Sequence, residues 1–427
     1  MKQPYYIYRV EKIIKWIQRG YAALFALLPW SSECSFGSWK LEVPGEPLTV
    51  LLGLGLGWVV LKKPSLVRST FSGHLLLKIS AVWIGWLSFC ISTSSMPVVS
   101  FKYWVVETGH WWVFAVGMAV FPGLFRKVLP FFAVSMAGMA VYTLIQHAGL
   151  HFRADQSMLA PMPFFPENNM YAAVLAMTIF SCLPFRHSVS GPVRFAFGLL
   201  LPAGLFFSFS RTAWASVVVA TSIWFLLRSS KMPGSIFIAG VILLCLSGLF
   251  FRKTICTALL HDVSFQERLN RYSCALRMAY DRPWTGFGPG TYQFQYFPYQ
   301  RPEEMTRISV TEPVKERSVH NLGRGGGAHS EYFQALTETG LPGLILFVAL
   351  LATVMWKGLR FGLWGMPEDH REFVFLLTLG LLTFFLHGLL NNFLHDGRVA
   401  ALFWGAAVAV GGGQWQLAVT VGSSRGQ

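Results

Sequence analysis

Long apolar runs recur along almost the whole chain, and short polar connections separate them. The runs fall near 21–30, 48–61, 73–91, 111–125, 128–147, 170–185, 194–209, 212–227, 234–251, 340–356, 373–392 and 399–414. A bilayer core about 30 Å thick is crossed by close to 20 mostly apolar residues in a helix. The pattern therefore predicts an all-α polytopic integral membrane protein with about 12 transmembrane helices, in which residues 1–427 form a single membrane domain.

The extended polar interruption at 252–338 predicts one large loop between two late transmembrane helices. Within it, apolar side chains recur at helical spacing opposite a charged face. The apolar positions are Phe265, Leu269, Tyr272, Leu276 and Ala279 or Tyr280, and the charged ones are Arg268, Arg271 and Asp281. This spacing predicts an amphipathic helix that lies on the membrane surface or on the helix bundle.

The run from Pro283 to Gly290 is predicted to end this helix in a turn. Its glycines from Gly286 onward superficially resemble a phosphate-binding loop, but the lysine and the preceding strand of such loops are missing. The turn is therefore the preferred interpretation.

Composition agrees with a membrane-embedded chain, because 53% of the residues are hydrophobic and 13% are charged, against about 25% charged in soluble domains. The net charge of +15 does not indicate nucleic-acid binding, since the basic residues stand mainly at the ends of apolar runs. With a cytoplasmic N-terminus, the positive-inside rule places 252–338 on the outer side. A cleaved signal peptide would begin similarly, but no small-residue cleavage site follows, so a retained first crossing is predicted.

The six cysteines lack the spacing of zinc or redox motifs. Cys256 and Cys274 would share the outer loop, where a disulfide is an open alternative to packing roles. His320 and His329 flank a glycine-rich stretch, which is a weak metal-binding pattern, and a mobile loop that closes over a substrate is the preferred interpretation. We therefore expect neither a metal ion nor another cofactor.

Two arginines stand where a charge needs a physical reason. Arg211 follows Ser210 at an outer junction between two apolar runs. It is either an interfacial arginine that snorkels to water or an anion contact held at a fixed depth. Arg268 lies on the polar face of the predicted surface helix, where contact with solvent or a lipid headgroup is the alternative to a functional role.

His329 opens the stretch that leads into the next transmembrane helix, and Glu331 and Glu338 follow on one helical face. Histidine exchanges a proton near neutral pH, so His329 is a candidate general base or acid, with an ordinary surface histidine as the alternative. A polar group at the end of a late run is expected to line the bundle interior: His387, Asn391, Asn392, His395 and Asp396.

Several of these segments, in this order, resemble the bacterial O-antigen ligase and O-antigen polymerase membrane superfamily over about residues 165–410. The segment Phe165-Pro166-Glu167-Asn168-Asn169, followed by Ala172, resembles the family's asparagine at the start of a central helix. Ser210-Arg211 resembles its helix-terminal serine-arginine. Arg268, followed by Pro283 and the glycine-rich turn, matches its loop signature. The stretch 329–340 matches the family's histidine, glutamate and glycine entry to the following helix.

Two positions depart from that pattern and leave the subfamily open. Tyr272 stands where the family usually has tryptophan, and Ser330 stands where asparagine is common. Neither departure affects the charged groups.

The resemblance implies a metal-independent glycosyltransferase that moves a glycan from an undecaprenyl-diphosphate donor to lipid A core or a growing polysaccharide. Arg211 and Arg268 would bind the diphosphate, and His329 would assist the acceptor or the reacting centre, on the periplasmic face of the bacterial inner membrane. Guanidinium groups can stabilise the charge on a departing diphosphate without a metal. Further substrate-binding candidates are Arg271, Asn169 and Glu338, although helix capping or packing explains the last two as well.

Two functions of other classes are open alternatives. A transporter of lipid-linked glycans would use the same arginines to recognise the diphosphate during passage, but internal repeats and broken helices are not evident in the sequence. A membrane scaffold would need none of these charges. Ligase and polymerase share the donor chemistry and differ in the acceptor, so the sequence does not separate them. Membrane lipids are the remaining expected partners, and nucleic acid is not one.

Overall fold

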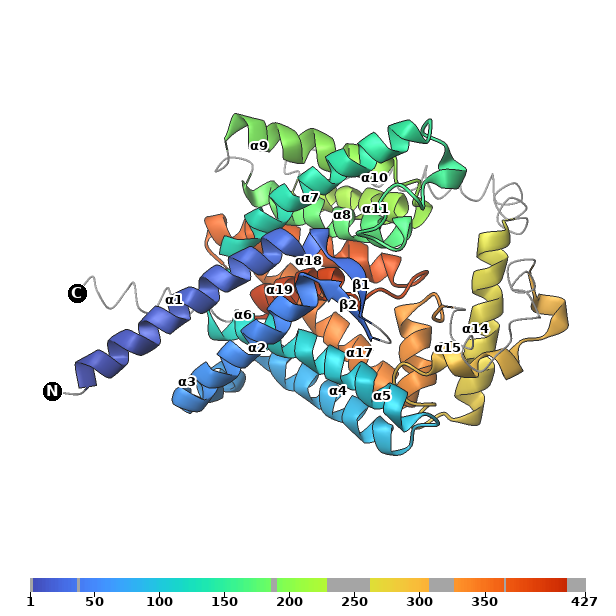
Figure 1. Ribbon diagram of the computed structural model, residues 1–427, viewed down its shortest axis with the longest axis horizontal. Helices are drawn as coiled ribbons and strands as arrows, with labels where there is room; N and C mark the ends of the chain where they lie inside the picture. Colours follow the sequence, from blue (N-terminus) through green and yellow to red (C-terminus); the bar gives the residue numbers. More distant parts are fainter. Residues whose placement is uncertain are drawn as a thin grey trace.

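The computed structural model describes residues 3–36, 39–185, 190–228, 262–306, 326–364 and 366–412. These residues form a helical bundle with one small hairpin (Figure 1). The helical class is as the sequence predicted. The hairpin was not predicted, and its strands β1 (Ser32–Phe36) and β2 (Trp39–Val43) pair antiparallel, with Ser32 opposite Val43.

Within the described residues, six helices are long and apolar enough to cross a membrane. They are Gly45–Lys62, Leu75–Ser92, Leu124–Gly149, Asn168–Phe185, Glu331–Leu363 and His370–His387. Three shorter apolar helices are Gly191–Phe206, Arg211–Leu227 and Gly397–Gly411. The predicted run 234–251 lies outside the described residues, so the number of about 12 crossings stays a prediction.

The first predicted crossing, 21–30, falls at the end of a longer helix, α1 (Gln3–Leu27). The predicted run 111–125 is also only the end of a longer helical segment, which begins at Pro97 and ends at Val120. The first half of this helical segment was not predicted, because Glu107 and His110 interrupt the apolar pattern. Both side chains are nevertheless buried. Buried ionisable groups of this kind need partners, and Glu107 has His395, whose Nδ1 lies 2.9 Å from its Oε1.

Helix α18 (Glu368–His387) lies in the centre of the bundle, where it packs against α8 (Asn168–Cys182), α11 (Arg211–Arg228), α17 (Glu331–Leu363) and α19 (Gly397–Gly411). The other helices of the bundle are α2 (Gly45–Lys62), α3 (Pro64–Gly73), α4 (Leu75–Ser92), α5 (Pro97–His110), α6 (Gly117–Val120), α7 (Leu124–Gly149), α9 (Gly191–Phe195) and α10 (Leu201–Phe206). The short π-helical and 3-10 segments are η1 (Leu28–Trp30), η2 (Trp111–Val116), η3 (Ala154–Gln156), η4 (Leu183–Phe185), η5 (Ala196–Leu200), η6 (Phe297–Tyr299) and η7 (Pro302–Glu304).

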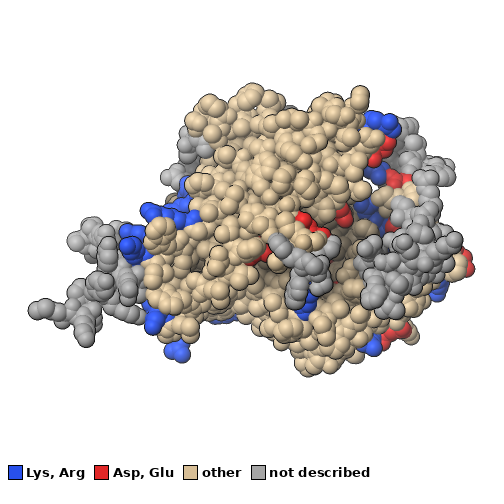
Figure 2. All heavy atoms as spheres, viewed as in Figure 1, with Lys and Arg blue, Asp and Glu red and all other residues tan. Residues whose placement is uncertain are grey.

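Charged residues gather at the two ends of the face in Figure 2, and the broad surface between them is mostly uncharged. Large apolar side chains are exposed on this bundle, among them Leu54 at 68% and Ile145 at 66%. Such a surface is costly in water and favourable against lipid. The N-terminal end of α1 and helix α14 (Val263–Asp281) lie at opposite ends of the molecule (Figure 1).

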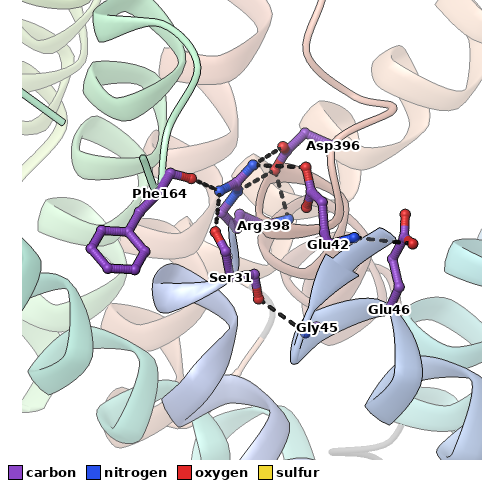
Figure 3. A network of polar contacts seen from close by, with 7 residues as sticks. All are labelled: Ser31, Glu42, Gly45, Glu46, Phe164, Asp396 and Arg398. Carbon is purple, nitrogen blue, oxygen red and sulfur yellow. Dashed lines mark hydrogen bonds and ion pairs between the residues drawn. The ribbon is translucent and has the colours of Figure 1, made fainter. Parts of the chain in front are cut away.

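A buried arginine holds the hairpin to the bundle (Figure 3). Arg398, at the start of α19, is 1% exposed, and its Nε donates to Oδ1 of Asp396 at 2.9 Å. Its Nη2 lies 3.2 Å from Oε1 of Glu42 on β2, and its Nη1 donates to the carbonyls of Ser31 and Phe164. One guanidinium therefore joins three regions that are distant in sequence: the hairpin, the segment at Phe164 and the start of α19.

The predicted amphipathic helix is confirmed as α14. Of its two predicted placements, packing of the apolar stripe on the bundle is not what the structure shows, and a position on the membrane surface stays a prediction. Leu269, Leu276 and Tyr280 are exposed, at 40%, 55% and 87%. The buried positions include Glu267 and Arg271, which pair with each other. The buried face combines this charged pair, whose groups find partners inside the protein as burial of a charge requires, with Cys274, Ala275 and Met278. Leu269, Leu276 and Tyr280 of the apolar stripe face outward, whereas Tyr272 stacks on Phe333.

Candidate functional site

The guanidinium groups of Arg211 and Arg268 converge on the first turn of α14. Asp262 is the N-cap of this helix, and its Oδ1 accepts hydrogen bonds from the backbone N–H groups of Ser264 at 2.9 Å and Phe265 at 3.2 Å. Its Oδ2 forms an ion pair with Nη2 of Arg211. Nη1 of Arg268 donates to the hydroxyl of Ser264 at 2.7 Å. Two cations that are 57 residues apart in sequence therefore meet at one helix end.

The tight turn before α11 gives Arg211 its position. Nδ2 of Asn168 donates to the carbonyl of Ser208 at 2.9 Å, and the hydroxyl of Ser210 donates to Oδ1 of Asn169 at 2.8 Å. Phe209 adopts a left-handed backbone with φ of 54°, a conformation that costs free energy and that the surrounding contacts must maintain. Asn169 thus lies beside the Arg211 turn, and its predicted substrate contact stays a prediction.

The segment after α18 holds the Nε group of Arg268. Its Nε donates to the carbonyl of Leu390 at 3.1 Å. Burial and the neighbouring charge of Arg211 lower the pKa of Arg268, but an arginine remains protonated at neutral pH. Among the described residues no carboxylate forms an ion pair with Arg268, so this cation has capacity for an anionic ligand.

His329 lies close enough to Arg268 and Arg271 for their charges to act on its ring. Burial, together with these two cations, lowers the pKa of His329 to about 4. The ring is therefore neutral at neutral pH and able to accept a proton. The backbone of His329 is left-handed with φ of 52°, and its carbonyl accepts from the hydroxyl of Tyr272 at 3.1 Å.

Arg271 is directed into the protein instead of toward the first turn of α14. Its Nε donates to Oε1 of Glu267 at 3.0 Å, its Nη1 donates to the carbonyl of Gly326 at 3.2 Å, and its guanidinium lies 4.2 Å from the ring centre of Tyr296. These contacts hold the segment before His329 against α14. The predicted contact between Arg271 and a substrate is not tested by them.

Glu338 joins the two most specific motifs of the sequence. Its carboxylate accepts from the backbone N–H of Gly290 at 2.8 Å and from that of Tyr292, at the start of α15 (Tyr292–Gln295), at 3.0 Å. The N–H groups of Phe287 and Gly288 donate to the carbonyls of Thr337 and Glu338, both at 2.9 Å. The glycine-rich segment forms turns, without helix or strand, and docks on α17. It therefore positions the start of α17, just after His329.

A break in α17 at Gly340 makes this docking possible. Gly340 has φ of 70° and ψ of −175°, a conformation open to glycine and strongly unfavourable for other residues. A Cβ at this position would lie 2.3 Å from the carbonyl oxygen of Trp284. The kink also lets the N–H of Leu341 donate to the carbonyl of Pro283 at 2.7 Å.

Substituting Gly340 with alanine is expected to destabilise the protein by about 2 kcal/mol or more, because strain and the clash with Trp284 add. Thermal unfolding of the detergent-solubilised protein measures this effect. Gly57→Ala is the matched control, since a Cβ at this position in helix α2 would meet no atom within 4 Å, and it should be neutral or slightly stabilising. Equal effects of the two substitutions would contradict the docking role of Gly340.

Sequence reasoning did not identify Asp262, and it did not identify the structural roles of Asn168 and Glu331. Oε1 of Glu331 accepts from the N–H groups of Phe393 at 2.6 Å and Leu394 at 2.7 Å. Asp262 could have been recognised, because aspartate immediately before a helical run is a strong N-cap signal. The roles of Asn168 and Glu331 had no local signal, since the partners of Asn168 are 11 and 40 residues away and those of Glu331 are more than 60 residues away.

The structure leaves two sequence-based alternatives without a test, since His320 and Cys256 lie outside the described residues. Cys274 is buried and its thiol lies 3.6 Å from Oδ1 of Asn270. Within the described ranges, no group of three or more histidine, cysteine or acidic side chains is arranged to hold a metal ion.

The described part of the chain thus defines a helical membrane protein with a cationic site at the end of its bundle. Residues 195–348 match the family model described as O-antigen ligase. This match confirms the resemblance to the O-antigen ligase and polymerase superfamily, and it contains Arg211, Arg268, His329 and Glu338. It also supports a membrane glycosyltransferase type of enzyme. None of the curated proteins compared with the chain matches it.

Proposed function

We propose that this protein transfers a glycan from an undecaprenyl-diphosphate donor to an acceptor, either lipid A core or a growing polysaccharide, at the periplasmic face of the inner membrane. The observation that carries the proposal is the convergence of Arg211 and Arg268 on one helix end, within electrostatic reach of a neutral His329. This combination provides two cations for a diphosphate and one base for a hydroxyl group.

The arginines act on the leaving group in this proposal. Transfer breaks the bond between the anomeric carbon and the phosphate oxygen, and the electron pair leaves with the diphosphate. Negative charge therefore develops on that oxygen, and fixed guanidinium donors stabilise it more strongly in the transition state than in the bound donor. Arg268 has the stronger claim to this role, because it is partly buried and anchored at two donors.

His329 acts on the acceptor. The acceptor hydroxyl oxygen forms the new bond to the anomeric carbon and loses its proton, which the neutral imidazole accepts. No metal is needed to balance these charges in the proposed step. The location suits the donor, since its lipid can stay in the bilayer while the glycan extends into water at the end of the bundle.

A reconstituted reaction tests the proposal. Purified full-length protein is mixed in detergent with a lipid-linked glycan and an acceptor, and the product is followed by gel and mass spectrometry. A new glycosidic product is expected, and a lipid A core acceptor compared with a glycan acceptor separates ligase from polymerase. Movement of the donor across vesicles without any product would instead indicate a transporter.

His329→Asn is expected to lower kcat by about 100-fold or more, the range of general acid–base contributions. Asparagine tolerates the left-handed backbone at this position better than alanine does, so the substitution removes the base with little added strain. Wild-type activity should decline only below about pH 4–5, because the pKa of the free enzyme's His329 is about 4. A decline centred near pH 6.5, or full activity of His329→Asn, would contradict the role of this side chain.

A further inference from the structure

We propose that Asp262 is an exchangeable counter-anion of Arg211, which the donor diphosphate displaces on binding and which returns to help expel the product diphosphate. This inference rests on the proposed function. In it, Asp262 is a positioning residue, because it acts through Arg211 and does not touch the reacting atoms.

The two oxygens of the Asp262 carboxylate have separate tasks. Oδ1 caps α14 through the N–H groups of Ser264 and Phe265, whereas Oδ2 faces Nη2 of Arg211. The Asp262 side chain is held, with 18% exposure, while the Arg211 side chain is 67% exposed. Arg211 can therefore exchange the carboxylate for another anion without disturbing the cap.

The hydrogen bonds and charge of Arg211 also keep Asp262 ionised. Burial alone would raise the pKa of the Asp262 carboxyl, but the contact with Arg211 and the two backbone donors lower it below its usual value. A negative group thus already occupies the place beside Arg211 that an anionic ligand would take. Among the described residues, Arg268 has no such ion pair. An anionic ligand would therefore displace a carboxylate from Arg211 but not from Arg268.

The counter-anion of Arg211 would matter most for release of the product diphosphate. In the donor, each phosphate of the diphosphate is esterified and carries about one negative charge. After the glycan leaves, the product ends in a phosphate with a charge of about −1.5 to −2. Two unopposed arginines would therefore bind the product more tightly than the donor. A carboxylate attached to the same helix end competes for Arg211 and lowers this retention.

Asp262→Asn tests the inference because asparagine caps helices as well as aspartate does while removing the charge. The probe is inorganic pyrophosphate, titrated into the purified full-length protein by calorimetry. Asp262→Asn should bind it about two- to fivefold more tightly, which is the range for an exposed ion pair, and the difference should shrink at high salt. In steady-state transfer, KM for the donor and kcat should both fall.

Matched variants separate the possible failures. Asp155→Asn neutralises a carboxylate in the exposed pair with Arg153 and should leave pyrophosphate binding unchanged. Unchanged or weaker binding by Asp262→Asn, while Arg211→Ala and Arg268→Ala lose binding, would overturn the counter-anion role alone. If Arg211→Ala and Arg268→Ala both bind pyrophosphate like wild type, the proposed diphosphate site itself is wrong.

Discussion

Arg268→Ala is expected to reduce glycan transfer by about 100- to 1000-fold, the loss seen when one fixed donor to a developing anion is removed. The physical reason is geometric: Nε is held by the carbonyl of Leu390 and Nη1 by Ser264, so the guanidinium has one orientation. Initial rates with a lipid-linked donor, normalised to purified protein, measure the loss.

Two further substitutions on α14 show whether this effect is specific. Arg268→Lys keeps the charge but loses the planar fork, so it should recover only a small part of the activity. Arg277→Ala removes an arginine about two and a half turns further along α14, where it pairs with Glu304. It should transfer glycan at close to the wild-type rate. Comparable losses for Arg277→Ala and Arg268→Ala would indicate a general requirement for α14 instead of a diphosphate contact.

Arg398→Met is expected to destabilise the protein by about 3–5 kcal/mol, the cost of removing one partner from a buried ion pair. Asp396, 6% exposed, would then remain as a buried charge without its cation, and the hairpin would lose the Nη2 contact to Glu42. Thermal unfolding in detergent provides the measurement. Arg153→Ala, which breaks an exposed pair, should change stability by about 1 kcal/mol or less.

The double substitution Arg398→Met with Asp396→Asn identifies the source of that cost. Asparagine keeps the N-cap of α19, where Asp396 accepts from the N–H of Arg398 at 2.9 Å, and removes the stranded charge. The double variant should therefore be more stable than Arg398→Met alone. A double variant that is less stable than the single one would show that the hydrogen bonds, and not the unpaired charge, dominate.

Helix α14 shows where reading the sequence succeeded and where it failed. Its existence followed from the spacing of apolar residues, because periodicity depends only on local backbone geometry. Its packed face did not follow, because Glu267 and Arg271 look like solvated charges until their partners are known. Burial of a charge is decided by the groups opposite it, and these lie in other segments of the chain.

The candidate site divides in the same way. The sequence singled out five candidate residues, partly because charged groups at the ends of apolar runs need a reason and partly by the family resemblance: Arg211, Arg268, His329, Asn169 and Glu338. Nothing local indicated that Glu338 would bind the backbone of Gly290 and Tyr292, or that Arg211 would meet the cap of α14. The functional roles of these residues stay predictions until the variants are measured.

By itself, the sequence determined the helical class of the protein, the positions of most of its apolar helices, the resemblance to the O-antigen ligase and polymerase superfamily and the residue types available for chemistry. These properties follow from hydropathy and spacing, which act over one or two helical turns. Only the tertiary structure decided that Arg211 and Arg268 share one helix end, that Asp262 pairs with Arg211, and that Arg398 holds the hairpin to the bundle. Those contacts depend on how segments distant in sequence pack together, and patterns over one or two helical turns do not predict that packing.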